Sequence, residues 1–324
     1  MRALQAQVLE SVDDYADVEL PDPQPGPGQV RIRVRACGVG YVDALVSLGR
    51  YQVKPPLPHI PGGEVAGEID ALGEGVEGLA LGDRVMAQAA GGFAERVCAP
   101  SAGVVRLPQG LDFAAASGLR INYLTALHGL RQRGGLKAGE RLLVLGAAGG
   151  VGTAAVQVGR LLGAEVIAAA STEEKRAFAA AHGAHAVLDT EPEGWRERLK
   201  AATGGKGPDV VFDPVCGPLF QPAFRSLAWG GRHLVVGFAG GPIPALPANL
   251  TLMKGAGLIG VDVRQFLLFE AEQARADLAE LLGWIAEGRM TPPVGRVFPF
   301  AEAKAALSYA LSGQGAGKTV LTIG

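Results

Sequence analysis

A glycine-rich turn between an apolar run and a helix-like segment is the part of this sequence whose residue types best predict chemistry. Residues 142–145 are apolar, and Ala147-Ala148-Gly149-Gly150-Val151-Gly152 follows them. Gly149 and Gly152 take the second and third positions of the dinucleotide fingerprint, where glycine allows close approach of a pyrophosphate and close helix packing. Ala147 relaxes the first position. A ligand-free turn is the alternative, but the strand–helix context favours binding through the helix N-terminus by Ala148, Gly149, Gly150, Val151 and Gly152.

The end of the second expected strand bears on which nucleotide this turn would hold. An NAD site commonly places Asp or Glu there to bind the ribose 2′-OH, but this strand ends Ala168-Ala169-Ala170-Ser171-Thr172. A 2′-phosphate would meet no acid at the strand tip, so we expect NADP(H). The expected phosphate contacts are Ser171, Thr172 and Lys175. In the alternative, Ser171-Thr172-Glu173-Glu174 is only a capping box and Lys175 a solvated helix residue.

The elements around the turn predict an α/β fold with a doubly wound parallel sheet. After about residue 119, apolar strands alternate with helical segments at the spacing of βαβ units. The expected strands are 142–145, 165–170, 209–212 and 232–237, and the expected helices are 151–162, 172–182, 192–202 and 218–228. Residues 1 to about 118 contain short β-like runs separated by Pro and Gly, and 30–35 alternates with period two. A final helix, 271–287, precedes expected strands at 294–300 and 319–323.

Composition narrows the class of protein. A chain of 324 residues, 48% hydrophobic, predicts two domains with a sizeable core. The formal charge of −2 gives no basic field for nucleic acid or a lipid surface. Cys37, Cys98 and Cys216 are far apart, which argues against a disulfide framework. Because no run approaches the ~18 apolar residues of a membrane span and no signal peptide is apparent, we expect a soluble, cytoplasmic protein.

With these elements in place, the chain resembles the medium-chain dehydrogenase/reductase superfamily, and within it the zinc-free quinone oxidoreductase, or zeta-crystallin-like, branch. The matching segments keep the family order from end to end; they are 37–43, 49–51, 58–67, 82–85, 147–152, 213–215 and 315–318. The resemblance implies a GroES-like β-rich domain and a Rossmann domain. The implied boundaries are 1–118 for the GroES-like catalytic domain, 119–262 for the Rossmann NADP-binding domain, and 263–324 for a C-terminal segment returning to the catalytic domain.

The resemblance also bears on metal content. Alcohol dehydrogenases of the superfamily hold a catalytic zinc with a cysteine and a histidine, and those positions are Gly40 and Gly63 here. A catalytic zinc needs about three protein donors, and Glu64 alone cannot hold it, so we expect no metal. Without zinc, nothing is placed to polarise an alcohol, and the hydride acceptor must already be electrophilic.

Further site residues follow from the resemblance. Tyr51 is similar in position to the proton-donating tyrosine of the enoyl thioester reductase branch, and the alternative is a packed loop tyrosine. Asn122 and Thr125 are expected beside the nicotinamide; their spacing puts both on one helix face, and a cap or buried hydroxyl is the alternative. The family also places cofactor contacts at Gly237, Phe238, Ala239 and Lys318.

The leading interpretation is an NADPH-dependent oxidoreductase that transfers a hydride to quinones. A zinc-free enoyl-thioester or enone reductase is the first alternative, supported by Tyr51. A cofactor-binding structural protein, like the crystallins, is the second, because the branch usually has Asn where this chain has Gly40. Related chains often carry a tyrosine after the third Rossmann strand, against the adenosine phosphate, whereas this chain has Leu188-Asp189-Thr190. Asp189 argues against a 2′-phosphate.

The expected partners are a small-molecule electrophile and a second copy of the chain, with neither nucleic acid nor a membrane among them. Residues 253–261 are expected to form the last Rossmann strand. An unpaired strand edge invites pairing, and members of the superfamily commonly dimerise along this edge. A homodimer through the Rossmann domain is therefore expected.

Overall fold

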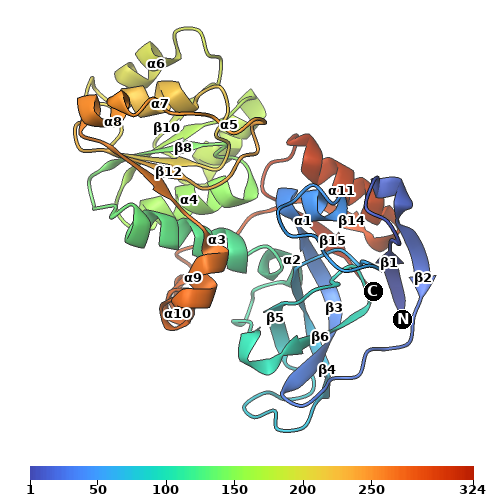
Figure 1. The fold of residues 1–324 in the computed structure, drawn as a ribbon. Helices are drawn as coiled ribbons and strands as arrows, with labels where there is room; N and C mark the ends of the chain where they lie inside the picture. The colour runs from blue at the N-terminus through green and yellow to red at the C-terminus, as the bar shows by residue number, and fades with distance from the viewer. The chain divides into compact units, whose positions relative to one another are not determined.

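The chain folds into two compact units. The computed structural model describes residues 1–324. The first unit comprises Met1–Arg120 and Leu282–Gly324, and the second comprises Ile121–Leu281 (Figure 1). None of the helices is long and apolar enough to cross a bilayer.

The second unit is built on a six-stranded parallel sheet in the order β10-β9-β8-β11-β12-β13. Its strands are β8 (Arg141–Leu145), β9 (Glu165–Ala169), β10 (Ala186–Leu188), β11 (Val210–Asp213), β12 (Arg232–Val235) and β13 (Gly257–Gly260). The chain starts in the middle, winds outward to β10, crosses over to β11 and continues to β13. The direction of winding therefore reverses between β8 and β11, which is where open α/β sheets bind ligands at the carboxyl ends of their strands. The predicted doubly wound fold is confirmed.

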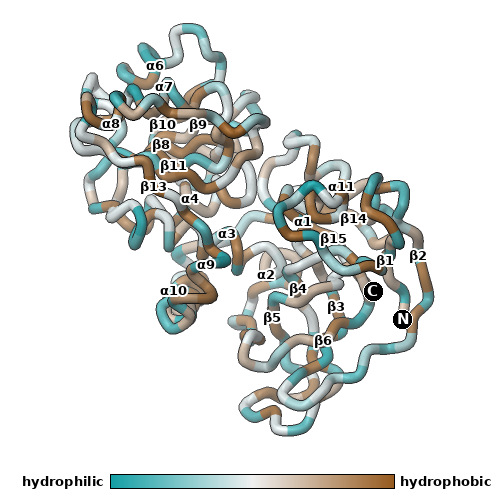
Figure 2. The backbone as a smooth tube through the Cα atoms, in the orientation of Figure 1, coloured by the Kyte–Doolittle hydropathy of each residue, from teal (hydrophilic) through white to brown (hydrophobic).

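Helices cover this sheet and enclose an apolar core. They are α3 (Arg120–Leu127), the π-helical turn η3 (His128–Arg133), α4 (Gly150–Leu161), α5 (Glu173–Ala181), α6 (Trp195–Ala202), α7 (Phe220–Ser226), α8 (Asn249–Lys254), α9 (Val263–Phe269) and α10 (Ala271–Ala286). Leu143, Ile167 and Val211 of three adjacent strands are fully buried in one cluster with α6 and α7. Figure 2 shows these central strands as hydrophobic segments.

The structure differs from the sequence-based boundaries at the end of this unit. Residues 263–281, expected to return to the first unit, belong to the second. Two contacts hold α10 there: Arg131 pairs with Glu280 at 2.6 Å, and Gln132 donates to Asp277 at 2.9 Å. The last strand is also shorter than the expected 253–261, because α8 extends to Lys254 and Gly255, with φ of 55°, caps it in the left-handed conformation.

The first unit contains a sheet in the order β14-β15-β3-β4-β5-β7, with β6 also paired to β3, and a two-stranded sheet of β1 and β2. The strands are β1 (Arg2–Gln5), β2 (Ala16–Glu19), β3 (Gln29–Val39), β4 (Glu64–Leu72), β5 (Arg84–Gln88), β6 (Arg96–Pro100), β7 (Val104–Arg106), β14 (Val294–Pro299) and β15 (Lys318–Thr322). Its helices are α1 (Tyr41–Ser47), α2 (Phe113–Ala116) and α11 (Ala303–Ser312), with 3-10 turns η1 (Val12–Asp14), η2 (Ser101–Gly103) and η4 (Phe300–Glu302). The C-terminal strand β15 pairs antiparallel with β3, so the C-terminal segment of the chain completes the sheet that β3 begins.

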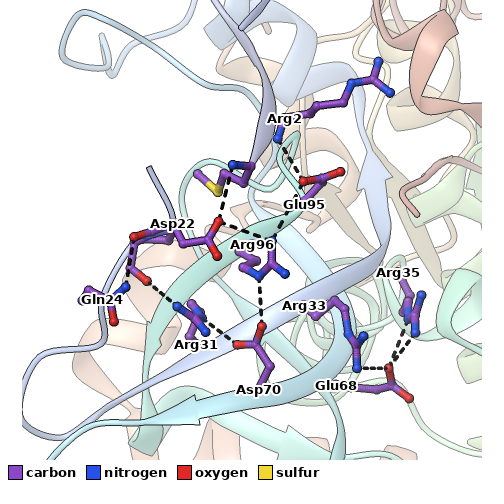
Figure 3. Close-up of polar contacts among 12 residues, drawn as sticks. Arg2, Asp22, Gln24, Arg31, Arg33, Arg35, Glu68, Asp70, Glu95 and Arg96 are labelled. Carbon is purple, nitrogen blue, oxygen red and sulfur yellow. Dashed lines mark hydrogen bonds and ion pairs between the residues drawn. The ribbon is translucent and has the colours of Figure 1, made fainter. Parts of the chain in front are cut away.

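Strand β3 shows why the alternating pattern at 30–35 predicts a half-buried strand. Ile32 and Val34 are buried, and the arginines that alternate with them face the other side of the sheet. There Asp70 bridges Arg31 at 2.7 Å and Arg96 at 3.1 Å (Figure 3). Partly exposed pairs of this kind contribute about 0–1 kcal/mol each, so the buried face stabilises the strand.

Candidate functional site

Three of the glycines in the turn after β8 differ in what they do. Gly146 has a left-handed φ of 59° and makes the tight turn, so Ala147, fully buried, is tolerated in the first fingerprint position. A Cβ on Gly152 would overlap the carbonyl oxygen of Gly146. A Cβ on Gly149 would meet only that oxygen, at 3.5 Å. Gly152 is therefore required by the fold, whereas the bare backbone at Gly149 leaves room for a ligand.

Helix α4 opens directly onto this space. Its N-cap is Gly149, which offers no side-chain acceptor, and the helix starts at Gly150. The first amides of a helix have no intrahelical partner, and they carry the positive end of the helix dipole. Together with the space over Gly149, these amides form a cradle that fits the pyrophosphate of a dinucleotide.

The segment between β9 and α5 shows which hydroxyl caps the helix. Thr172 is the N-cap, and its Oγ1 accepts a hydrogen bond from the Lys175 amide at 3.2 Å. The alternative in which Ser171 leads a capping box is therefore wrong, because the helix begins one residue later than that box requires. Ser171 is exposed at the strand tip. Burial lowers the pKa of Lys175, and Glu174 opposes this shift.

A basic residue that sequence reasoning missed lies at the same place. The Arg176 Nη1 donates to the carbonyl oxygen of Ala170 at 3.2 Å, which holds the guanidinium at the end of β9. The sequence does contain a signal for Arg176. It is the pair of basic residues in the first turn of a helix that follows a strand end without an acid. Lys175 and Arg176 thus put two basic residues near the start of α5, which follows Ser171.

The structure weakens the argument that Asp189 would repel the 2′-phosphate of NADPH. Its carboxylate accepts from the Glu191 amide at 2.9 Å and pairs with Arg198 at 2.8 Å. The Glu191 amide and Arg198 hold the pKa of Asp189 below its usual range. The acid is ionised, but the guanidinium offsets its charge.

The loops after β11 and β12 bring further predicted residues to the same sheet edge. The Ala239 amide donates to Pro214 O at 3.4 Å and the Gly240 amide to Val215 O at 2.7 Å. On its other side, the Val215 side chain packs against Gly146 of the glycine turn. The turn, the β11 loop and predicted residues 237–239 thus lie together at the carboxyl ends of β8, β11 and β12.

The two residues predicted on α3 have different surroundings. Thr125 is buried, and its Oγ1 donates to the carbonyl oxygen of Ile121 at 2.6 Å. This matches the buried-hydroxyl alternative, and a contact with the nicotinamide stays a prediction. Asn122 is half-buried one turn earlier on the same helix.

In the first unit, Lys318 is held by acids of its own unit. Its Nζ donates to Glu64 Oε2 at 3.1 Å, and its stem lies against Gly38, where a Cβ would come within 2.8 Å of Lys318 Cε. Burial opposes the ammonium charge, but Glu64 and Asp43 outweigh it and raise the pKa of Lys318. Lys318 is therefore held beside these two acids, and its contact with a cofactor stays a prediction. Tyr51 is half-buried in the loop after α1.

Comparisons with known proteins give consistent matches. Residues 26–109 match the alcohol dehydrogenase GroES-like domain, and residues 150–287 match the zinc-binding dehydrogenase family. The quinone oxidoreductase of Sus scrofa is 36% identical over 293 residues, which cover 89% of this chain and 87% of that protein. The quinone oxidoreductase of Thermus thermophilus, solved alone and with NADPH, superposes with a TM-score of 0.86 at 36% identity, covering 100% of both chains. The CurK enoyl reductase superposes with a TM-score of 0.90 at 25% identity, covering 100% of this chain and 99% of that one.

The name of the second matching family implies zinc, but the donors of this chain do not fit it. Gly40 and Gly63 have no side-chain donor, and no three His, Cys, Asp or Glu side chains form a group that could hold a metal ion. The Asp43 carboxylate accepts from the Gly40 amide at 2.7 Å, and Glu64 is paired with Lys318. Both acids are committed to partners within the protein, so no step of the chemistry is assigned to a metal.

Proposed function

The chain belongs to the quinone oxidoreductase branch of the medium-chain dehydrogenase/reductase superfamily, and from this premise we propose that it transfers a hydride from NADPH to quinones. The observation that carries the proposal is the open cradle at Gly149, at the point where the winding of the sheet reverses. The lack of a zinc donor set favours acceptors that need no Lewis acid.

In this proposal, three parts of the second unit bind the cofactor. The amides of Gly150, Val151 and Gly152 bind the pyrophosphate. Ser171, Lys175 and Arg176 hold the 2′-phosphate, and the backbone at 237–239 supports the nicotinamide half. When bound, the cofactor supplies a hydride from nicotinamide C4, and a proton from solvent or a protein acid completes the reduction. The protein supplies binding and orientation.

A substrate panel tests this function. The purified protein is expected to oxidise NADPH in the presence of quinones, followed as loss of absorbance of the reduced nicotinamide, and to turn over 2-enoyl thioesters and enones much more slowly. NADPH alone and heat-denatured protein are the controls. Cofactor binding without turnover of any acceptor would contradict the enzyme proposal and favour a structural role.

The enoyl-thioester or enone reductase remains the second candidate, because an enoyl reductase superposes over the full chain and Tyr51 offers a hydroxyl able to donate a proton. Preferential turnover of 2-enoyl thioesters that is lost in Tyr51→Phe would support this candidate over the first.

We also propose a homodimer formed along β13. This edge strand pairs only with β12, and Leu258 on it is 41% exposed. Trp229, Leu252 and Met253, from the adjacent loop and α8, are also largely exposed apolar side chains. An unpaired edge next to exposed apolar surface favours association with a second copy.

Leu258→Lys is expected to convert the dimer to a monomer, because a charge on the edge strand must be desolvated on pairing. Light scattering after size exclusion at micromolar concentration measures the mass. Leu81→Glu, at a turn of the first unit where Leu81 is 64% exposed, is the control and is expected to stay dimeric. A monomeric wild type would refute the assembly.

A cytoplasmic location completes the proposal. The three cysteines are unpaired, which suits a reducing compartment. Cell fractionation that recovers the protein outside the cytosol would count against it.

A further inference from the structure

We propose that His233 is a positioning residue for the nicotinamide half of the cofactor, acting through Asp213 on the loop after β11. The inference rests on the proposed function, since it assumes that a dinucleotide binds at the carboxyl edge of this sheet. It concerns two side chains to which neither the fingerprint nor the family resemblance gives a role.

The two side chains form an isolated polar pair inside the sheet core. His233 Nε2 lies 3.1 Å from Asp213 Oδ2, and neither residue has any exposed surface. His233 is on β12 and Asp213 is the last residue of β11. The ring of His233 is flanked by Phe220 and Phe224 of α7, with centroid separations of 4.9 and 6.1 Å.

Asp213 uses its other oxygen to fix the loop that follows it. Oδ1 accepts from the Val215 amide at 2.9 Å and the Cys216 amide at 2.7 Å. Cys216 has a φ of 47°, the only positive φ outside glycine in the chain. Residues with a side chain seldom adopt this conformation, so surrounding contacts must hold it. The orientation of one carboxylate therefore sets the shape of the loop, and His233 sets the orientation of the carboxylate.

The loop after β11 contacts the residues that are proposed to support the nicotinamide. The Val236 amide donates to Asp213 O at 2.9 Å and the Gly240 amide to Val215 O at 2.7 Å. A Cβ on Gly240 would come within 2.6 Å of Gly217 Cα, so the two backbones are in direct contact. Toward the glycine turn, the contacts of this loop are made by the side chains of Val215 and Pro214, which face Gly146. A shift of the loop should therefore disturb residues 236–240 more than the pyrophosphate cradle.

Apolar packing alone does not explain a histidine at this position. Nε2 faces the carboxylate of Asp213, and Nδ1 is buried without a hydrogen-bond partner. The adjacent strand residue Leu234 is apolar, and the ring of His233 packs against phenylalanines. A leucine would fill this space without an unsatisfied nitrogen, but it would leave Asp213 Oδ2 buried without its partner. What histidine adds is its hydrogen bond to Asp213.

The test compares two ligands that share the adenosine half. The dissociation constants of NADPH and of adenosine 2′,5′-bisphosphate, which lacks the nicotinamide, are measured by calorimetry for wild type and His233→Leu. His233→Leu is expected to weaken NADPH about tenfold, equal to about 1.4 kcal/mol, and to leave the bisphosphate unchanged within experimental error. His233→Gln, whose amide can donate to Asp213, is expected to restore much of the NADPH affinity.

Phe224→Leu is the matched control, because it perturbs the same core without removing a partner of Asp213. It is expected to lower the melting temperature and to leave the ratio of the two affinities unchanged. Equal weakening of both ligands in His233→Leu, or unchanged NADPH affinity, overturns the inference while the proposed function stands. A wild-type protein that does not bind NADPH overturns both.

Discussion

Gly149→Val is expected to abolish NADPH binding while leaving the fold intact. The valine side chain would fill the space over the first amides of α4, and each charge-assisted hydrogen bond lost there contributes about 1.5–3 kcal/mol. A loss of two such bonds raises the dissociation constant by at least about 100-fold, since about 1.4 kcal/mol corresponds to a factor of ten. The backbone of Gly149 has φ of −75° and ψ of 168°, which valine adopts without strain. Fluorescence titration with NADPH and thermal unfolding measure the two effects.

Gly152→Val provides the contrast. Its Cβ would overlap the Gly146 carbonyl oxygen, so it should unfold the second unit at lower temperature as well as lose binding. Gly283→Ala in α10, where a Cβ meets no atom within 4 Å, controls for a change of glycine as such. If Gly149→Val still binds NADPH with wild-type affinity, the cradle is not the pyrophosphate site.

Cofactor preference is expected to depend on Lys175. Lys175→Ala should weaken NADPH by about tenfold or more, since it removes a charge-assisted contact of about 1.5–3 kcal/mol, and should leave NADH nearly unchanged because NADH has no 2′-phosphate. Wild type is expected to prefer NADPH. Titration of both cofactors against wild type and variant measures the preference.

Two further variants sharpen this prediction. Ala170→Asp is expected to reverse the preference toward NADH, because a carboxylate at the strand tip accepts from the 2′-OH and repels a phosphate. Lys200→Ala removes an exposed charge from α6 and controls for the overall charge of the unit. If Lys175→Ala weakens the affinities for NADPH and NADH equally, Lys175 stabilises helix α5 and does not bind the 2′-phosphate.

The sequence alone identified the features that depend on local patterns. Strand β8 spans Arg141–Leu145 where 142–145 was expected, and α4 starts within one residue of its predicted start. Apolar periodicity and glycine sterics act over a few residues, so both can be predicted directly from the sequence. A short apolar run does not distinguish a strand from a helix, which is why 253–254 were expected in β13 but lie in α8.

Tertiary structure decided which polar groups meet. In the sequence, Asp189 argues against a bound phosphate, but the fold pairs it with Arg198, nine residues on. Lys318 reaches Glu64 across 254 positions, and His233 reaches Asp213 across 20. Such pairs depend on strand order and register, and no periodicity within one strand encodes which neighbour it will have. The sequence by itself therefore determined the nucleotide turn and the alternation of elements, whereas only the folded sheet, by bringing β12 beside β11, placed a buried histidine against the acid that shapes the neighbouring loop.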